Sequence, residues 1–408
     1  MAIGIDDIKA AHKRIAEGVP VTPCTESIPL SELCGSKIFC KLDYRLRTGS
    51  FKERGARNAL LLLGDAQRKR GVIAASAGNH ALGLAYHGAL LKIPVTVVMP
   101  RFSPLIKVST CRQLGANVIQ HGDAFMDARS CADEYAEKHK LTYIHGFDDP
   151  AIIAGQGTMG LEILAQVPDV DAIVVPIGGA GLIAGVSLAV KSLRPEVQVI
   201  GVEAEHSASF TAALKRGKPV KIDGLPTLAD GLAVGKVGTV SFAIAREHVD
   251  KTVTVNEQSL ALAIVRLIEL EKSVVEGAAA APLAAFLSKK LPELKGKCVV
   301  LALCGGNIDL TILDRVIELG LVADGRLCRF TAMISDRPGG LETLAHQIAS
   351  TGASIKDILH DRAFSGPDVT AVRVLCVVET MDHVHIQRLM KTIGEAGIKV
   401  IPESIESE

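Results

Sequence analysis

The 408-residue chain carries 45 basic and 45 acidic residues, and its zero net charge at pH 7 argues against a nucleic-acid or acidic-membrane partner. Aromatic residues make up only 3% of the chain and tryptophan is absent, which disfavours base-stacking platforms. No apolar run reaches 18 residues, no signal-like segment opens the chain, and the nine cysteines form no CxxC pair, so we expect a cytoplasmic protein with reduced thiols and no membrane span.

Short apolar strands alternate with helices over about the first three hundred residues. An amphipathic helix opens the chain at 1–18, and Ser103-Pro104 suits the start of another helix. Near-continuous apolar strands separated by helices are typical of parallel βαβ units, so we predict an α/β body with a ligand crevice at the carboxyl ends of its strands. The predicted strands lie in 71–76, 94–100, 116–122, the first part of 171–190, 197–204 and 297–307, and the helices between them include 81–91 and 125–139.

The pattern changes after Asn307. A helix at 310–325 precedes a strand, a helix, two strands, a helix and a closing strand. This β-α-β-β-α-β order is that of the ferredoxin-like fold. The expected division is 1–318 with a smaller subdomain at about 50–150, a linker at 319–326, and a second domain at 327–408.

A lone lysine, Lys52, stands in the first turn of a predicted helix, directly after Gly49-Ser50-Phe51. The helix dipole disfavours a cation at this position. Since a destabilised ammonium favours the neutral amine, Lys52 is a candidate nucleophile as well as an ordinary surface charge.

Glycine turns follow several of the predicted strands. The turn at 178–181 joins a strand to a helix, so its backbone N–H groups and the helix dipole can form an anion cradle. It lacks the GxxxxGK[ST] lysine and departs from GxGxxG spacing, which favours a phosphate outside triphosphate chemistry. Pyridoxal phosphate needs a lysine, a phosphate cradle and partners for its ring, and these parts suit it.

Five motifs in this order resemble one family. They are SFKERGA (50–56), SAGNHA (76–81), GGAGL (178–182), LADGLAV (228–234) and CGGN (304–307). The chain from about residue 5 to 318 is similar to the threonine dehydratases (threonine ammonia-lyases), which are fold-type II pyridoxal-phosphate enzymes with a two-subdomain α/β fold like the tryptophan synthase β-subunit. The tail at about 327–403 resembles a single ferredoxin-like ACT domain, a small-ligand regulatory module.

The resemblance implies roles for individual residues. Lys52 matches the lysine that forms a Schiff base with the cofactor, Phe51 would pack on the ring, and Cys304 would face the pyridine nitrogen. Asn79 matches the side chain that bonds the phenolic oxygen. The phosphate loop would be Gly178, Gly179, Ala180, Gly181 and Leu182, where relatives often have glycine in place of Ala180.

The same resemblance implies a reaction. Lys52 would remove the α-proton, and threonine would give 2-oxobutanoate and ammonia, or serine would give pyruvate. Ser76 is a second candidate catalytic residue beside Lys52. The loop that would hold the substrate carboxylate comprises Ser76, Ala77, Gly78, Asn79 and His80.

Several alternatives remain open from the sequence. Serine racemases carry a serine as second base before Gly-Asn-His, where this chain has Ala77. Threo-3-hydroxyaspartate ammonia-lyase is another relative. An alternative of a different functional class is a non-catalytic regulatory protein that binds an amino acid. A biosynthetic role leading to isoleucine and a degradative role are not separated.

The resemblance also implies a cation site, which in relatives lies near the region of residues 201–209. Glu203 is its candidate ligand, with Glu162 and Asp230 as other carboxylates near the site, but Ser209 stands where an acidic ligand would be expected. The sequence is compatible with a monovalent cation, with a divalent cation, or with no bound cation.

The tail suggests regulation. In an ACT-like module an amino-acid effector sits near the first strand-to-helix turn, which here comprises Asp336, Arg337, Pro338, Gly339 and Gly340. We expect a branched-chain amino acid, with isoleucine favoured over valine, acting on a homodimer or homotetramer. A purely dimerising tail is the alternative.

Overall fold

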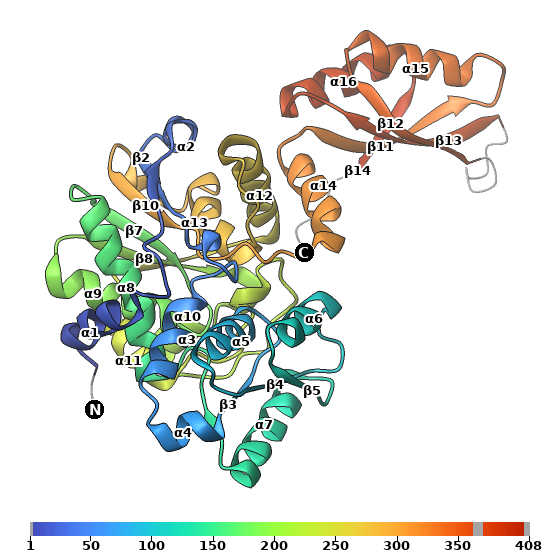
Figure 1. Cartoon of the computed structure of the whole chain (residues 1–408). Coiled ribbons are helices and arrows are strands. Elements are labelled where there is room, and N and C mark those ends of the chain that lie inside the picture. Colours follow the sequence, from blue (N-terminus) through green and yellow to red (C-terminus); the bar gives the residue numbers. More distant parts are fainter. Residues whose placement is uncertain (1–2, 362–369, 404–408) are drawn as a thin grey trace. The chain divides into compact units, whose positions relative to one another are not determined.

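The computed structural model describes residues 3–361 and 370–403 (Figure 1). The chain forms two compact units, Met1–Leu313 and Asp314–Glu408. Among the described residues, no helix is both long and apolar enough to cross a membrane.

The first unit is built on a six-stranded sheet in the order β1-β2-β10-β7-β8-β9. All neighbouring strands are parallel except β1 and β2, which are antiparallel. The central strands β7 and β10 are buried along their whole length, as the predicted apolar runs require. The strands are β1 (Cys24–Glu26), β2 (Lys37–Lys41), β7 (Ala172–Pro176), β8 (Gln198–Ala204), β9 (Lys251–Val255) and β10 (Cys298–Ala302).

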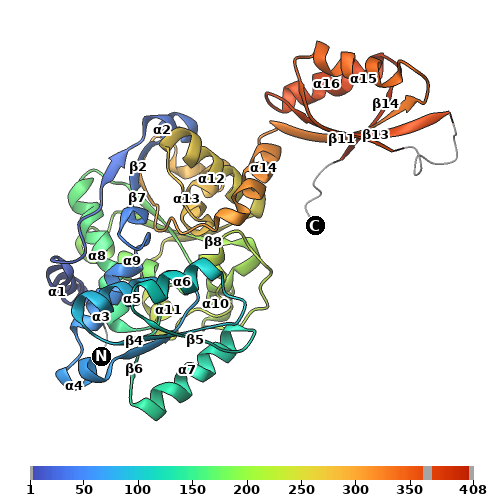
Figure 2. The same cartoon turned by 45° about the vertical axis from the view of Figure 1, so that its right-hand side comes forward.

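Helices cover both faces of this sheet, which confirms the predicted α/β body (Figures 1 and 2). One group packs together on one side and comprises α1 (Ile5–Ile15), α8 (Pro150–Gln166), α9 (Gly181–Leu193) and α11 (Thr239–His248). The other side carries α2 (Ile28–Cys34), α12 (Glu257–Glu271) and α13 (Gly277–Leu287).

Glycines bring three helices into backbone contact. A Cβ atom at Gly155 of α8 would lie 2.6 Å from the carbonyl oxygen of Arg54 in α3 (Lys52–Leu61). A Cβ atom at Gly185 of α9 would lie 2.3 Å from the carbonyl oxygen of Ile153 in α8. Real side chains do not approach so closely, so only glycine at these two positions permits α3 to pack on α8, and α8 on α9, at this distance.

A smaller parallel sheet, in the order β5-β4-β3-β6, forms the second lobe of the first unit. Alternate residues of its strands face two different cores. Ala74 and Val97 pack with α5 and α6, whereas Ile73 and Val98 pack with α7. The elements are β3 (Val72–Ala75), α5 (Asn79–Leu91), β4 (Val95–Met99), α6 (Leu105–Gln113), β5 (Asn117–Gln120), α7 (Phe125–His139) and β6 (Thr142–Tyr143), with the shorter helices α4 (Asp65–Arg70) and α10 (Ser209–Arg216) elsewhere in the unit.

A buried ion cluster anchors the start of α3. Arg54 donates from Nε to Asp43 Oδ2 at 2.7 Å and from Nη1 to Glu162 Oε1 at 2.6 Å. Lys41 Nζ bonds the other Glu162 oxygen at 2.5 Å, and all four side chains are buried. Two cations and two anions balance one another, so Glu162 is occupied as a structural partner of Arg54 and Lys41.

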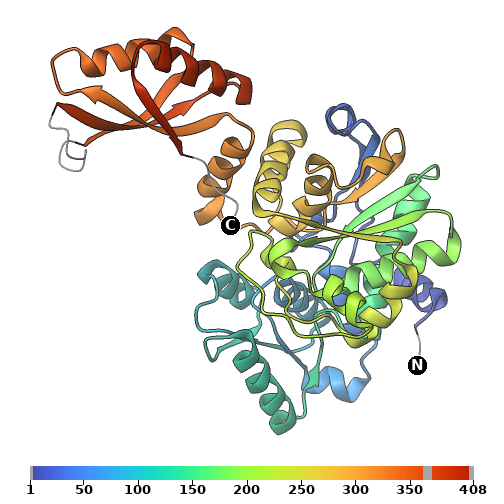
Figure 3. The same ribbon diagram turned by 180° about the vertical axis from the view of Figure 1, so that it is seen from behind.

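The second unit is an antiparallel sheet in the order β12-β13-β11-β14, with α15 and α16 on one face (Figure 3). Phe330, Val374 and Leu389 are buried between the sheet and the helices. This confirms the predicted ferredoxin-like order. Its elements are α14 (Leu313–Ala323), β11 (Leu327–Ser335), α15 (Gly340–Ser350), β12 (Ser354–Asp361), β13 (Ala371–Glu379), α16 (His383–Glu395) and β14 (Lys399–Glu403).

Candidate active site

Lys52 is the first residue of α3. The turn that precedes it, at 49–51, is hydrogen-bonded to the loop that follows β10. The Phe51 N–H donates to the carbonyl oxygen of Cys304 at 2.9 Å, and the Gly306 N–H donates to that of Gly49 at 2.8 Å. The Lys52 Nζ donates to the Gly146 carbonyl oxygen at 2.7 Å and lies 5.2 Å from the centre of the Phe51 ring. Two of the predicted motifs are thus joined at the candidate nucleophile.

The Lys52 amine lies deep among protein atoms although part of the side chain remains accessible. Burial lowers its pKa to about 8, against the opposing effects of Cys304 and Glu276. Burial also raises the pKa of the Cys304 thiol well above its ordinary value. A readily deprotonated amine therefore stands near an uncharged thiol, the state expected of a partner for an unprotonated ring nitrogen.

The loop at 178–182 follows β7 and leads into α9. A Cβ atom at Gly179 would lie 2.3 Å from the Phe147 ring, and one at Gly181 would lie 2.5 Å from the Phe147 carbonyl oxygen. Ala180 holds a positive φ of 71° directly before the helix. This compact turn at the N-terminus of a 13-residue helix is suited to hold an anion, and side chains at both glycines would collide with Phe147.

The loop at 76–80 has one face open and one face bonded. Ser76, Ala77, Gly78 and Asn79 are each partly exposed, so this backbone can reach a ligand. The Ser76 hydroxyl accepts a hydrogen bond from the Gly78 N–H at 3.3 Å.

His80 closes that loop as a neutral imidazole. Burial and the nearby Lys52 lower its pKa to about 3. Its Nε2 lies 3.1 Å from the Ile144 carbonyl oxygen, so Nε2 carries the proton. Nδ1 is buried with no hydrogen-bond partner among the described residues, which leaves one lone pair for a ligand.

Asn79 lies in a chain of amide and carboxylate groups. Asn307 Nδ2 donates to Asn79 Oδ1 at 2.8 Å and to the Thr48 carbonyl oxygen at 2.7 Å. Asn79 Nδ2 donates to both oxygens of Glu276, at 2.8 and 3.0 Å. Glu276, at the start of α13, did not emerge from the sequence, where it is one acidic residue before an alanine-rich run.

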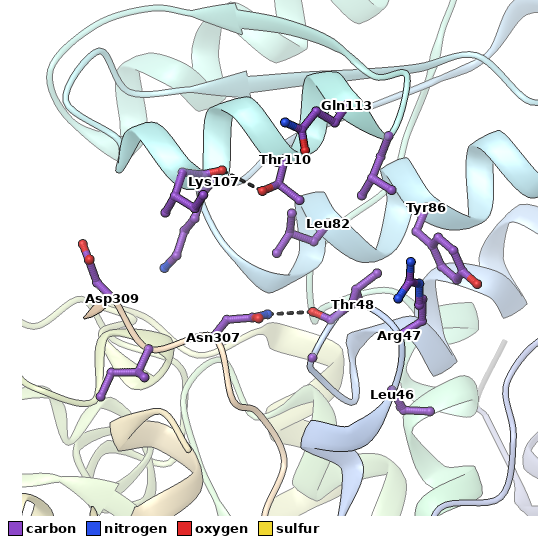
Figure 4. Close-up of a pocket in the computed structure, with 14 residues that line it drawn as sticks. Leu46, Arg47, Thr48, Leu82, Tyr86, Lys107, Thr110, Gln113, Asn307 and Asp309 are labelled. Atoms are coloured by element: carbon purple, nitrogen blue, oxygen red, sulfur yellow. Dashed lines mark hydrogen bonds between the residues drawn. The ribbon is translucent and has the colours of Figure 1, made fainter. Parts of the chain in front are cut away.

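Two cavities open beside these residues. Figure 4 shows one of about 500 Å³, in which Thr48 and Asn307 face Lys107 and Thr110 of α6. The other, of about 370 Å³, is lined by Glu276 and Asp230 among others. Lys107 borders both cavities, and its Nζ lies 3.1 Å from Asp230 Oδ2. Both cavities therefore lie between the two lobes of the first unit.

The carboxylate of Glu203 is buried and already engaged. It accepts hydrogen bonds from the backbone N–H groups of Phe210 and Thr211, at 2.7 and 2.9 Å, and from the Thr211 hydroxyl at 2.6 Å. No cluster of three or more potential metal-ligating side chains occurs within residues 3–361 and 370–403. These bonds show that the Glu203 carboxylate caps the N-terminus of α10, and its role as a cation ligand stays a prediction.

The candidate regulatory residues lie together in the second unit. Asp336, Arg337, Pro338 and Gly339 are exposed, and Gly340 begins α15. The Gly340 N–H donates to the Arg337 carbonyl oxygen at 3.1 Å, and Gly339 has a φ of 97°. The predicted turn is present, with a glycine where a left-handed conformation is required.

Comparisons with known proteins agree with this geometry. Residues 15–305 match the model of the pyridoxal-phosphate dependent enzyme family. The chain is 43% identical to an L-threonine ammonia-lyase of Thermotoga maritima, over 98% of this chain and 99% of that protein. A solved threonine deaminase isoform 2 of Solanum lycopersicum is 36% identical, with a TM-score of 0.74 over 78% of this chain and 90% of that one. A solved serine racemase of Dictyostelium discoideum is 34% identical, with a TM-score of 0.72 over 76% of this chain and 99% of that one. The chain therefore belongs to the pyridoxal-phosphate-dependent enzymes, within the group that holds the threonine ammonia-lyases.

Proposed function

We propose that this protein is an L-threonine ammonia-lyase that converts L-threonine to 2-oxobutanoate and ammonia, and L-serine to pyruvate. The observation that carries the proposal is the Lys52 amine at the start of α3, which donates to the Gly146 carbonyl oxygen and whose pKa is lowered to about 8 by burial. The Thermotoga maritima relative, which is similar over nearly the whole length of both chains, is named an L-threonine ammonia-lyase.

The residues present fit pyridoxal phosphate. The glycine cradle at 178–182 suits its phosphate, the uncharged Cys304 thiol suits its ring nitrogen, and Asn79 can donate to its phenolic oxygen. Phe51 supplies an apolar surface beside Lys52. When bound, the cofactor supplies an aldehyde that condenses with amines and a ring that withdraws electrons from the α-carbon.

The chain's own residues supply proton transfer and orientation. A neutral Lys52 amine can accept the α-proton of the substrate, and its burial keeps a useful neutral fraction near pH 8. The open backbone at 76–79 suits the substrate carboxylate. His80, uncharged and with a free Nδ1 lone pair, can accept a hydrogen bond from the substrate without placing a competing cation beside Lys52.

Racemisation is disfavoured by the side chain at position 77. Inverting the α-carbon needs a second proton donor on the face opposite Lys52, and the methyl group of Ala77 has no exchangeable proton. A silent regulator is disfavoured because a catalytically silent chain has no need to keep an amine buried with a lowered pKa.

The test uses purified protein loaded with pyridoxal phosphate. Lys52→Ala is expected to lose the near-violet absorption band of the bound cofactor and to form 2-oxobutanoate about a thousandfold more slowly. The exposed Lys69→Ala variant is the matched control and is expected to keep both. A band that persists in Lys52→Ala would remove the assignment, and D-serine formed faster than pyruvate would support the racemase instead.

For the second unit we propose that an amino-acid effector, with isoleucine favoured, binds at the exposed Asp336–Gly340 turn. Its support is the glycine conformation at the start of α15, which lets a ligand approach backbone N–H groups. A homo-oligomer of two or four copies would carry the response.

A further inference from the structure

Three of the five motifs that mark this family converge on one side chain outside them. The Glu276 carboxylate accepts from Asn79 in the 76–81 motif. A Cβ atom at Gly305, in the 304–307 motif, would lie 2.1 Å from Glu276 Oε1, and one at Gly231, in the 228–234 motif, would lie 3.7 Å from the same oxygen. With the Glu276 carboxylate in this position, residue 305 has no room for a side chain.

The Glu276 side chain does not stabilise the helix that it precedes. It stands at the N-cap position of α13, yet its side chain makes no capping hydrogen bond to that helix. The side chain is 4% exposed, so the carboxylate is buried in order to meet Asn79. Burying a carboxylate is costly unless its bonds repay the loss of water, and here both of its contacts end on one amide.

The bonds of Asn79 define a single orientation of its amide. Asn307 donates to Oδ1, so Oδ1 is the acceptor and Nδ2 faces Glu276. Seen from Asn79 Nδ2, the two oxygens of the Glu276 carboxylate are separated by a much smaller angle than the two N–H bonds of the amide. One N–H is therefore shared between both oxygens. The second N–H of Asn79 is left for a ligand.

We propose that Glu276 is a positioning residue of the proposed lyase reaction, acting through Asn79: its carboxylate holds the Asn79 amide so that the remaining N–H points to the cofactor. The inference rests on the proposed function, because it gives Asn79 a cofactor to serve. Glu276 itself need not touch substrate or cofactor.

The charges around Glu276 make this hold sensitive to pH. Burial raises the pKa of the Glu276 carboxyl to about 7, and Asp230 adds to that effect. The Asn79 bond and the ammonium groups of Lys107 and Lys52 act in the opposite direction. The uncharged Cys304 thiol also lies near it, and Glu257 and Asp309 line the same cavity as Glu276. Above pH 7 the carboxylate binds Asn79 strongly, and below pH 7 protonation weakens that bond.

The test compares wild-type holoenzyme with Glu276→Gln, which keeps the shape and removes the charge. The ratio of wild-type kcat/KM for threonine to that of Glu276→Gln is expected to fall about tenfold on acidification through pH 7, the loss expected for one charged hydrogen bond. Protonation of Lys52 lowers the rate of both proteins alike, so this ratio isolates the effect of Glu276. The absorption band of the bound cofactor, titrated without substrate, should show the same transition in the wild type only.

A double-mutant comparison separates positioning from simple structural support. If Glu276 acts through Asn79, then Asn79→Ala and Asn79→Ala/Glu276→Gln should have the same kcat/KM within about twofold. Asp309→Asn, which removes a charge from the same cavity without a bond to Asn79, is the matched control and is expected to keep the transition.

The failures of the two proposals are distinguishable. A wild-type protein with neither the cofactor band nor threonine activity would remove the proposed function. An active wild type whose pH profile is unchanged in Glu276→Gln, or independent effects that multiply in the double variant, would overturn the role of Glu276. If Glu276→Gln loses the native circular dichroism, Glu276→Asp replaces it and is expected to keep the pH transition with kcat/KM lowered by about tenfold; an unchanged kcat/KM would also overturn the role.

Discussion

The neighbourhood of Lys52 in the first unit and the 336–340 turn in the second differ in how far their polar side chains are buried. Around Lys52, an amine, an imidazole and a carboxylate are withdrawn from water, and each has a shifted pKa. The 336–340 turn is exposed, and Asp336 and Arg337 remain in solvent. Buried polar groups are costly, so their convergence identifies a reaction site from geometry alone, whereas an exposed turn identifies only a possible contact.

The sharpest way to break this contrast is to dismantle the ion cluster under Lys52. Asp43→Ala leaves the Arg54 guanidinium buried beside a single carboxylate, and we expect a loss of about 3–5 kcal/mol in the free energy of unfolding. Urea denaturation of the first unit would measure it. The half-exposed pair of Lys251 and Glu293 supplies the control, since Glu293→Ala should cost at most about 1 kcal/mol. Equal losses would show that burial of the cluster has no special weight.

A pair of glycines tests the contrast in packing. Gly179→Ala would press a methyl group into the Phe147 ring, and we expect a loss of about 1–3 kcal/mol in the free energy of unfolding together with weaker cofactor retention. Gly394→Ala, in α16 of the second unit, meets no atom within 4 Å and should instead stabilise its helix by up to about 1 kcal/mol. Thermal unfolding and dialysis against buffer without cofactor measure both. A harmless Gly179→Ala would contradict the close fit of the loop.

The lowered pKa of Lys52 gives a pH test on apoenzyme. Because only the neutral amine reacts, the rate at which added pyridoxal phosphate is incorporated should rise about tenfold per pH unit below pH 8 and level off above it. Growth of the near-violet band after mixing measures the rate. Lys52→Arg, which cannot lose its charge, should give no band. A profile that keeps rising to pH 10 would mean that the amine is not buried as described.

The smallest effect is expected at the exposed turn. Arg337→Ala should change basal threonine activity by less than about twofold, since exposed side chains contribute little to the fold. It should nevertheless weaken the response to isoleucine. Activity titrated with isoleucine and valine measures this, with the exposed Lys391→Ala as control. If the wild type responds to neither amino acid, the effector proposal fails while the lyase proposal stands.

Much of the fold follows from sequence pattern. The predicted helix at 125–139 has the same bounds as α7, and each predicted apolar run of the body contains a strand. The short or half-buried elements were not predicted: β6 has two residues, and β9 is only partly buried, so neither forms an apolar run. Helix α13 was missed because an alanine-rich segment buried on all sides has no amphipathic period.

The site divides in the same way. Lys52, Asn79 and the 178–182 loop stand in motifs, and their ordered spacing made them visible. Glu276 could not be predicted because its hydrogen bonds are made to Asn79, which lies 197 positions away in the chain. Glu203 shows an ambiguity that sequence does not resolve, since a carboxylate at a strand end can be satisfied by the N-terminus of the next helix as well as by a cation.

The glycine contacts that join α3, α8 and α9 also set how far this protein can diverge. At Gly155 and Gly185 any side chain would force two backbones apart and carry the start of α3 with them. In a saturation library selected only for folded protein, these two positions should therefore admit glycine alone, while exposed positions drift freely. The lineage of this enzyme is thus constrained most tightly at residues that have no side chain to offer the reaction.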